Sequence, residues 1–222
     1  MKQNNNKYME KFLGSSVTKK FVMAIAGLFI ILFLLVHLGI NFLLLIDDPV
    51  PFNSAAHFMA SNVVVKVFEI FLLAGFLIHI IWGIILQIQN WLARPSRYKK
   101  TASSQTSFFS KYMIYLGIII GVFLFIHFMN FYFVKLGWVE GDHENFYGMA
   151  NDLFHLPMYI VIYLVSFIFL AFHLHHAFQS SFQTLGLNHN KYTPVIKGIG
   201  LIYSIVVPLG FSIIPIIIYF FK

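Results

Sequence analysis

Long apolar runs separated by short polar segments dominate the pattern along the chain. Five runs reach spanning length, because a helix needs about 20 residues to cross roughly 30 Å of hydrocarbon. Lipid offers no partners for backbone polar groups, and a two-residue alternation is absent, so each run should be helical. We expect an all-α integral membrane bundle of five transmembrane helices in a single domain, residues 1–222. The spans cover about residues 21–46, 63–92, 112–134, 157–182 and 195–221.

The composition agrees with a membrane protein. Of the 222 residues, 59% are hydrophobic and 10% are charged, whereas about a quarter of the residues in a soluble domain are charged. The chain has no cysteine, which excludes disulfides, thiolate catalysis and iron–sulfur ligation within it. Residues 1–20 lack the pattern of a cleaved signal peptide, so we expect a cytoplasmic N-terminal segment there.

Basic and acidic residues gather on opposite sides of the predicted membrane. Five Lys or Arg residues precede the first span, five lie between the second and third, and two lie between the fourth and fifth. The opposite side holds seven of the eight acidic residues. By the positive-inside rule, the N-terminus is cytoplasmic and the C-terminus is outside. This topology explains the net charge of +7 without a nucleic-acid partner, and predicts a multi-pass protein of the inner (cytoplasmic) membrane.

Each of the first four spans carries a histidine within the expected bilayer. His37 and His127 come 16 and 15 residues after the start of spans that lead outward. His79 and His173 both come 16 residues after the start of spans that lead inward. At about 1.5 Å per residue, the first two lie toward the outer side and the other two toward the inner side. The spacing therefore predicts an outer layer of His37 and His127 and an inner layer of His79 and His173.

Paired imidazoles at one depth suit bis-histidine haem. A six-coordinate haem iron takes one nitrogen from each side of its ring, and helix bundles build such sites from inward-facing side chains. Two layers predict two haems that form an electron path across the bilayer. A single intramembrane histidine can instead hydrogen-bond a neighbouring helix. His176 shares a helix face with His173 and stands as the alternative ligand in the fourth span.

Five short stretches distributed along the chain carry a family resemblance. They are LLVHLGIN around His37, FNSAAHFM at residues 52–59, LIHIIWG around His79, FIHFMNF around His127 and FHLHHAFQSSFQTLGL at residues 172–187. Over nearly its whole length, the chain resembles the five-helix, dihaem cytochrome b subunit of succinate:quinone oxidoreductases. This family comprises the cytochrome b558 of succinate dehydrogenases and the cytochrome b of fumarate reductases.

The resemblance implies the cofactors and their ligands. Two haem b groups are expected, with His37 and His127 as axial ligands of the outer haem iron. His79 and His173 would hold the inner haem. In the fourth span the family has a histidine followed four residues later by a small residue. His173 with Ala177 fits that pattern, although glycine is commoner at the second place, so His176 stays open.

The resemblance also implies partners and an activity. A flavoprotein with covalent FAD and a protein with three iron–sulfur clusters would dock on the cytoplasmic face, where the basic residues 7–20 are part of the expected dock. This chain would be their membrane anchor and would pass electrons between the iron–sulfur subunit and membrane quinone. Five-helix, dihaem members work with menaquinone. Succinate chemistry would not occur in this chain alone, and the resemblance leaves open whether succinate is oxidised or fumarate reduced.

Quinone chemistry needs a proton donor or acceptor beside a redox centre. Near the outer layer, the candidates are Asn53 and His57 in FNSAAHFM and Glu69 at the start of the second span. The alternatives are that Asn53 and His57 serve as turn and cap residues, and that Glu69 pairs with Lys66 one turn earlier.

Two other classes of protein compete with this interpretation. The haem b subunit of a hydrogenase or a formate dehydrogenase shares the bis-histidine logic but places more than one ligand on a helix. A transporter that uses histidines as proton or metal sites would favour acidic residues among them, and broken helices. The first four spans contain no Asp or Glu except Glu69 at a margin, which disfavours the transporter.

Overall fold

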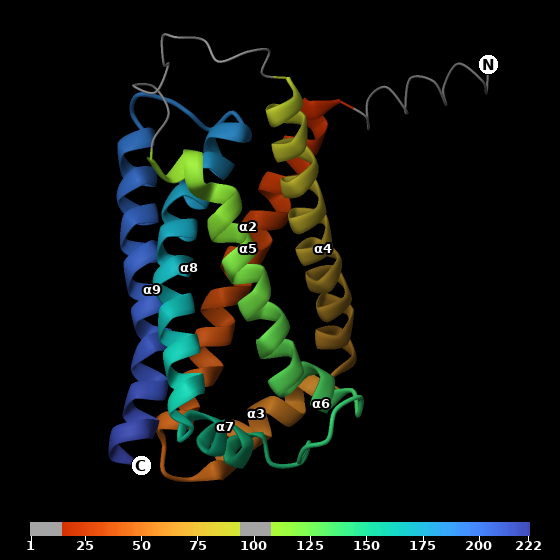
Figure 1. Ribbon diagram of the computed structural model, residues 1–222, viewed down its shortest axis with the longest axis vertical. Helices are drawn as coiled ribbons and strands as arrows, with labels where there is room; N and C mark the ends of the chain where they lie inside the picture. Colours follow the sequence, from red (N-terminus) through yellow and green to blue (C-terminus); the bar gives the residue numbers. More distant parts are fainter. Residues whose placement is uncertain (1–14, 94–107) are drawn as a thin grey trace, which may run out of the picture.

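The computed structural model of the protein describes residues 15–93 and 108–222, with side chains from residue 112 onward in the second part. Residues 1–14 and 94–107 lie outside the described residues, and with them most of the predicted cytoplasmic segment and of the basic dock at residues 7–20. The described chain is helical, and its long helices run side by side in an elongated bundle (Figure 1).

Five helices are long and apolar enough to cross a membrane, as the hydropathy pattern predicts. The all-α membrane bundle is thus confirmed in the described parts of the chain. Most bounds agree with the predicted spans to within a few residues, and α4 agrees at both ends. The five helices are α2 (Ser16–Asn41), which continues as the 3-10 turn η1 (Phe42–Leu45), α4 (Val63–Leu92), α5 (Phe108–His127), α8 (Pro157–Thr184) and α9 (Thr193–Phe221).

Polar caps set the helix starts that hydropathy alone misses. The helix α2 begins five residues before the expected position 21, because the Ser15 hydroxyl accepts a hydrogen bond from the Thr18 backbone N–H at 3.1 Å. The Asn62 side chain caps α4 by accepting from the backbone N–H groups of Val64 and Val65. A cap lies in the polar flank of an apolar run, so it extends the helix beyond the run itself.

Two short helices that the hydropathy pattern does not predict close one end of the bundle: α3 (Pro49–Ser61) and α7 (Phe146–Phe154) (Figure 1). The Asn53 side chain joins them. Its Nδ2 donates to Asn145 Oδ1 at 3.0 Å, and its Oδ1 accepts from the Tyr147 backbone N–H at 2.9 Å. The stretch FNSAAHFM, in which turn and cap roles were the alternative for Asn53 and His57, is therefore part of a helix, and Asn53 bridges two helices.

Among the five spanning helices, α9 buries the largest share of its most apolar segment against the rest of the protein. A Cβ at Gly200 would lie 2.8 Å from the Phe178 ring of α8, and one at Gly210 would lie 2.9 Å from Leu38 of α2. These glycines let α9 approach both neighbours closely. The helix runs without interruption through Pro208 and Pro215, and both prolines are buried.

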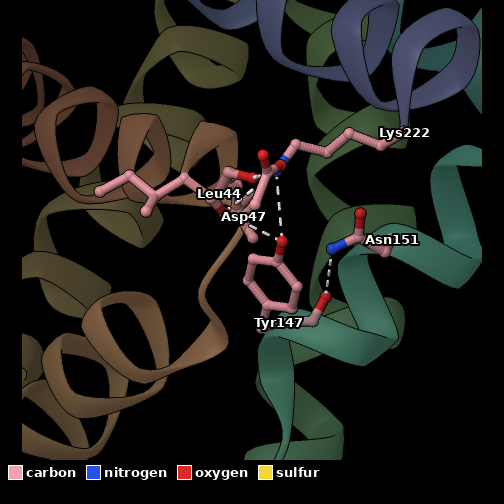
Figure 2. A network of polar contacts seen from close by, with 6 residues as sticks. Leu44, Asp47, Tyr147, Asn151 and Lys222 are labelled. Atoms are coloured by element: carbon pink, nitrogen blue, oxygen red, sulfur yellow. Dashed lines mark hydrogen bonds and ion pairs between the residues drawn. The ribbon is translucent and has the colours of Figure 1, made fainter.

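A lysine that follows α9 joins three elements at the end that carries α3 and α7 (Figure 2). Lys222 Nζ donates to the carbonyl oxygens of Leu44 and Ile46, both at 3.0 Å, and to the Tyr147 hydroxyl at 3.2 Å. It also lies 3.1 Å from Asp47 Oδ1; its side chain is 12% exposed and that of Asp47 is 95% exposed. The cation thereby satisfies carbonyl groups at the end of η1 and ties η1 and α7 to α9.

We expect Lys222→Met to destabilise the protein by about 1–3 kcal/mol, since it leaves the two carbonyls without their charged donor. Burial lowers the pKa of Lys222, but hydrogen bonds to Tyr147 and Asp47 outweigh it, and the net pKa is raised. A raised pKa means that the contribution is complete below the usual lysine value of about 10.4 and is lost as the pH rises through the folded-state pKa.

The measurement is thermal unfolding of the purified protein in detergent at neutral pH. Lys66→Met is the control, because Lys66 is an exposed lysine at the same end of the bundle. Equal melting temperatures for the two variants would contradict the proposed role of Lys222.

Candidate functional site

The structure brings both predicted histidine pairs together between the helices. In the outer layer, the ring centres of His37 on α2 and His127 at the end of α5 lie 5.7 Å apart, with the ring planes at 83°. In the inner layer, His79 on α4 and His173 on α8 lie 6.2 Å apart at 72°. All four rings are partly buried. The contact with His79 is made by His173, and this geometry favours His173 over His176.

Aromatic rings surround the outer pair. Phe33 stacks on His37 with a centre distance of 5.2 Å, and Phe123 stacks on His127 at 6.0 Å. Phe211 of α9 contacts His37 at 5.6 Å. These rings form an apolar wall that keeps water from the imidazoles and fixes their orientation.

Three polar side chains that sequence reasoning missed lie beside the outer pair. Asn41 Nδ2 donates to the His37 carbonyl at 2.8 Å and lies 3.4 Å from His37 Nδ1. Tyr163 of α8 places its hydroxyl 3.3 Å from His127 Nδ1, and Asn130 Nδ2 donates to the same hydroxyl at 3.2 Å. An asparagine three or four residues after each histidine, in HFMN and HLGIN, was the available signal for two of them.

The helix changes type immediately after His127. The helix α5 ends at this residue, and one turn of π-helix, η3 (Phe128–Tyr132), follows before the short α6 (Phe133–Lys135). The Phe133 N–H donates to the Phe128 carbonyl five residues earlier. Single π turns inside helices are frequent at functional sites, and this turn carries Asn130.

The inner pair has fewer polar contacts. His79 Nδ1 lies 3.5 Å from the Met23 carbonyl, at the limit of a hydrogen bond. His173 Nδ1 is buried and has no hydrogen-bond partner among the described residues. Gly27 of α2 lies against His79: a Cβ there would stand 3.4 Å from His79 Cε1 and 3.7 Å from Ser181 Oγ. Gly27 is therefore at the depth of the inner layer, ten residues before His37.

The quinone candidates occupy two separate places. Glu69 does not pair with Lys66, as the alternative interpretation has it; its partner is Lys135 of α6, with Nζ 2.7 Å from Oε2 and both side chains about three-quarters buried. His57 is exposed in a shallow hollow that does not include Glu69. The hollow is lined by Asn53, Ser54, His57, Phe58, Ser61 and Glu144.

The two histidine pairs fit the ligand requirements of haem. A ring centre lies about 3 Å from a metal bound at about 2 Å by its nitrogen, so two imidazoles that clamp one metal stand about 6 Å apart. The observed separations of 5.7 and 6.2 Å match this value. In the described residues, no three His, Asp or Glu side chains gather as ligands for a bare metal ion. Each layer supplies two nitrogens, the number that a six-coordinate haem iron takes from a protein.

Comparison of the chain with protein-family models, curated proteins and solved structures finds no match. What the fold and the site define is a multi-pass helical membrane protein with two levels of facing interior histidines. Any assignment of function rests on these residues and their geometry.

Proposed function

We propose that this protein is a dihaem cytochrome b, a membrane subunit that passes electrons between a partner protein and membrane quinone. One observation carries the proposal: two histidine pairs, each from two different helices, face each other at the separation expected for axial ligands of one metal. A buried imidazole nitrogen without a partner is costly within a membrane, and coordination would occupy one nitrogen of each ring. Coordination would give all four rings a role.

His37 and His127 would hold the outer haem, and His79 and His173 the inner one. Bound haem supplies one-electron redox chemistry, and the protein supplies ligation, orientation and a dry surrounding. Phe33 stacks on His37 and keeps that ring in its orientation. The depth of Gly27 against His79 places the layers ten residues apart along α2, which is about 15 Å. Two haems at these levels would form a path along the bundle.

The particular function we propose is the haem b membrane anchor of a succinate:quinone oxidoreductase, in the succinate dehydrogenase and fumarate reductase family. The arrangement of one ligand on each of four helices supports this over a hydrogenase or formate dehydrogenase subunit, which places more than one ligand on a helix. The chain has no cysteine for iron–sulfur clusters, so clusters and flavin would belong to partner subunits. These subunits would dock at the N-terminal, cytoplasmic end, near the inner layer.

Glu69 is the proton-exchanging residue that we propose for quinone, with menaquinone as the expected type. It lies near the start of α4, at the end of the bundle that holds the outer layer. Its carboxylate is three-quarters buried and bonded to Lys135, so an acid and a base meet at the bundle margin, within reach of membrane quinone. Asn53 is engaged in joining α3 to α7, and His57 is exposed, which leaves Glu69 as the best placed of the three.

Pyridine haemochrome analysis should give two b haems per chain, and His127→Ala should reduce this number to one. His37→Ala should leave the same remaining haem as His127→Ala, with the same α-band and midpoint potential, because both variants open the outer layer. His79→Ala and His173→Ala should share the other haem.

His176→Ala is the matched control, since it removes a histidine one turn from His173 on the same face. It should retain both haems. Loss of the inner haem in His176→Ala but not in His173→Ala would reassign that ligand. Wild-type protein purified without any haem would overturn the proposed function.

Gly27→Val should remove the inner haem and spare the outer one. The γ carbons of valine would extend beyond the Cβ position that already lies 3.4 Å from His79, and would displace the ring from its pair. Gly39→Val is the control, since Gly39 is an exposed glycine of the same helix with no atom within 4 Å of its Cβ position. Equal haem spectra for the two variants would argue against the proposed packing.

Glu69→Gln should slow reduction of the haems by a menaquinol analogue at least tenfold, because the amide cannot accept a proton. Its absorption spectrum should equal that of the wild type. Glu140→Gln, in an exposed loop, controls for the loss of a charge at the same end of the bundle. Unchanged stopped-flow reduction rates in Glu69→Gln would move the quinone reaction elsewhere, with His57 as the next residue to test.

A further inference from the structure

Tyr163 is a buried tyrosine whose hydroxyl faces a histidine from another helix. Its side chain is 3% exposed, and Phe123, Phe154 and Phe167 meet its ring at steep angles. The hydroxyl lies 3.3 Å from His127 Nδ1. This enclosure holds the oxygen in one position, because a buried aromatic side chain has little freedom once its ring faces are covered.

Asn130 occupies one acceptor position of the hydroxyl. Its Nδ2 group only donates hydrogen bonds, so the oxygen of Tyr163 accepts from it at 3.2 Å. The oxygen keeps one further lone pair for His127. Two arrangements fit the 3.3 Å contact, because either the Tyr163 O–H donates to Nδ1 or the Nδ1–H donates to the Tyr163 oxygen. When Nε2 binds a metal, the ring proton must lie on Nδ1, so the second arrangement is the one that goes with haem ligation. The opposite tautomer would carry its proton on Nε2 and could not bind a metal there.

We propose that Tyr163, itself contacted by Asn130, is a positioning residue for His127: it accepts a hydrogen bond from the Nδ1–H when Nε2 holds haem, and thereby strengthens Nε2 as a haem ligand. The inference rests on the proposed dihaem function. It extends that function to Tyr163, which lies on α8, the helix that carries His173 of the inner layer. A hydrogen-bond acceptor on the distal nitrogen makes an imidazole a stronger donor to its metal, and a stronger donor stabilises the oxidised iron.

The π turn supports a dedicated arrangement. Asn130 lies within η3, the single π-helical turn that begins directly after His127. An uninterrupted α-helix would place the residue three positions after His127 differently relative to α8. With this turn, His127 and Asn130 both contact the hydroxyl of Tyr163. Single π turns are frequent at functional sites.

The inner layer lacks an equivalent side chain. His79 Nδ1 has a backbone carbonyl at 3.5 Å, and His173 Nδ1 has no hydrogen-bond partner among the described residues. Removing the Tyr163 hydroxyl should therefore change one haem and leave the other as an internal reference in the same molecule.

The test is redox titration of the purified full chain carrying Tyr163→Phe, followed by optical and low-temperature EPR spectra. Both haems should remain bound, because the substitution removes one oxygen atom. The midpoint potential of the outer haem should rise, since the weaker ligand stabilises ferric iron less, and its low-spin EPR g values should shift. The inner haem should keep its potential and its signal.

Tyr203→Phe is the matched control. Tyr203 is also a partly buried tyrosine, and its hydroxyl donates to the Ile31 carbonyl at 2.6 Å. Among the described residues, its ring contact is with Phe178 and not with a histidine of either pair. Its removal should shift neither potential. A rise of the outer potential in Tyr203→Phe equal to that in Tyr163→Phe would show a general packing effect and overturn the proposal.

Asn130→Leu supplies a second variant with the opposite expected sign. Without the amide donor, the tyrosine oxygen accepts more strongly from His127, and the outer potential should fall. A shift of both variants in the same direction would indicate loosening of the cluster and overturn the inference, as would an unchanged outer potential in Tyr163→Phe. Two bound haems with unchanged potentials would leave the dihaem function intact, whereas protein without haem would reject that function.

Discussion

An imidazole within a membrane needs a partner, and this constraint organises the bundle. The surrounding lipid cannot hydrogen-bond the ring nitrogens, so burying an imidazole without a partner costs about 2–7 kcal/mol. Four of the five spanning helices carry such a ring, and the rings meet in two pairs. One pair joins α2 to α5 and the other joins α4 to α8. Each level thus depends on two helices that are not adjacent in the sequence.

The spanning helices differ in how much of their surface is buried and in whether they carry a histidine of a pair. The helix α9 carries no histidine and buries the largest share of its apolar window, against α2 and α8. The helices α4 and α5 bury little of theirs, and each contributes one ring to a layer. A group bound between the two rings of a layer would add contacts to α4 or α5, the helices that are least buried by packing within the protein. A ligand that binds only the folded state stabilises it, so binding of the proposed cofactor and bundle stability would be linked.

The sequence was sufficient for features that depend on one helix at a time. Span positions followed from hydropathy, and the depth of each histidine followed from its distance along its own span, which is why both pairs were predictable. Contacts between segments that are distant in the sequence were not predictable in this way. Lys135 lies 66 residues from Glu69, and Tyr163 lies 36 residues from His127, and nothing local marks either contact.

The short helices, and the choice between His173 and His176 as the partner of His79, were harder to predict for a different physical reason. The helix α3 is too short and too polar for a hydropathy signal, and its start depends on Asp48, whose side chain accepts from the Val50 N–H. His173 and His176 share a face of α8, so periodicity cannot separate them. Only the position of His79 on another helix does so, through the contact of its ring with His173.

The polar surroundings of the two layers differ, and this difference bears on electron flow. The outer layer has Tyr163, Asn130 and Asn41 beside its histidines, and the inner layer has a carbonyl at 3.5 Å. In the proposed dihaem protein, axial imidazoles of the same type would otherwise give similar potentials, so hydrogen bonding to the histidines would be one way for this chain to separate them. If the two layers hold haems as proposed, a hydrogen-bonded His127 would lower the potential of the outer haem relative to the inner one. Electron transfer from the proposed quinone end inward would then be favoured energetically, and transfer outward would need another driving force, such as the membrane potential acting on charges that cross the bilayer.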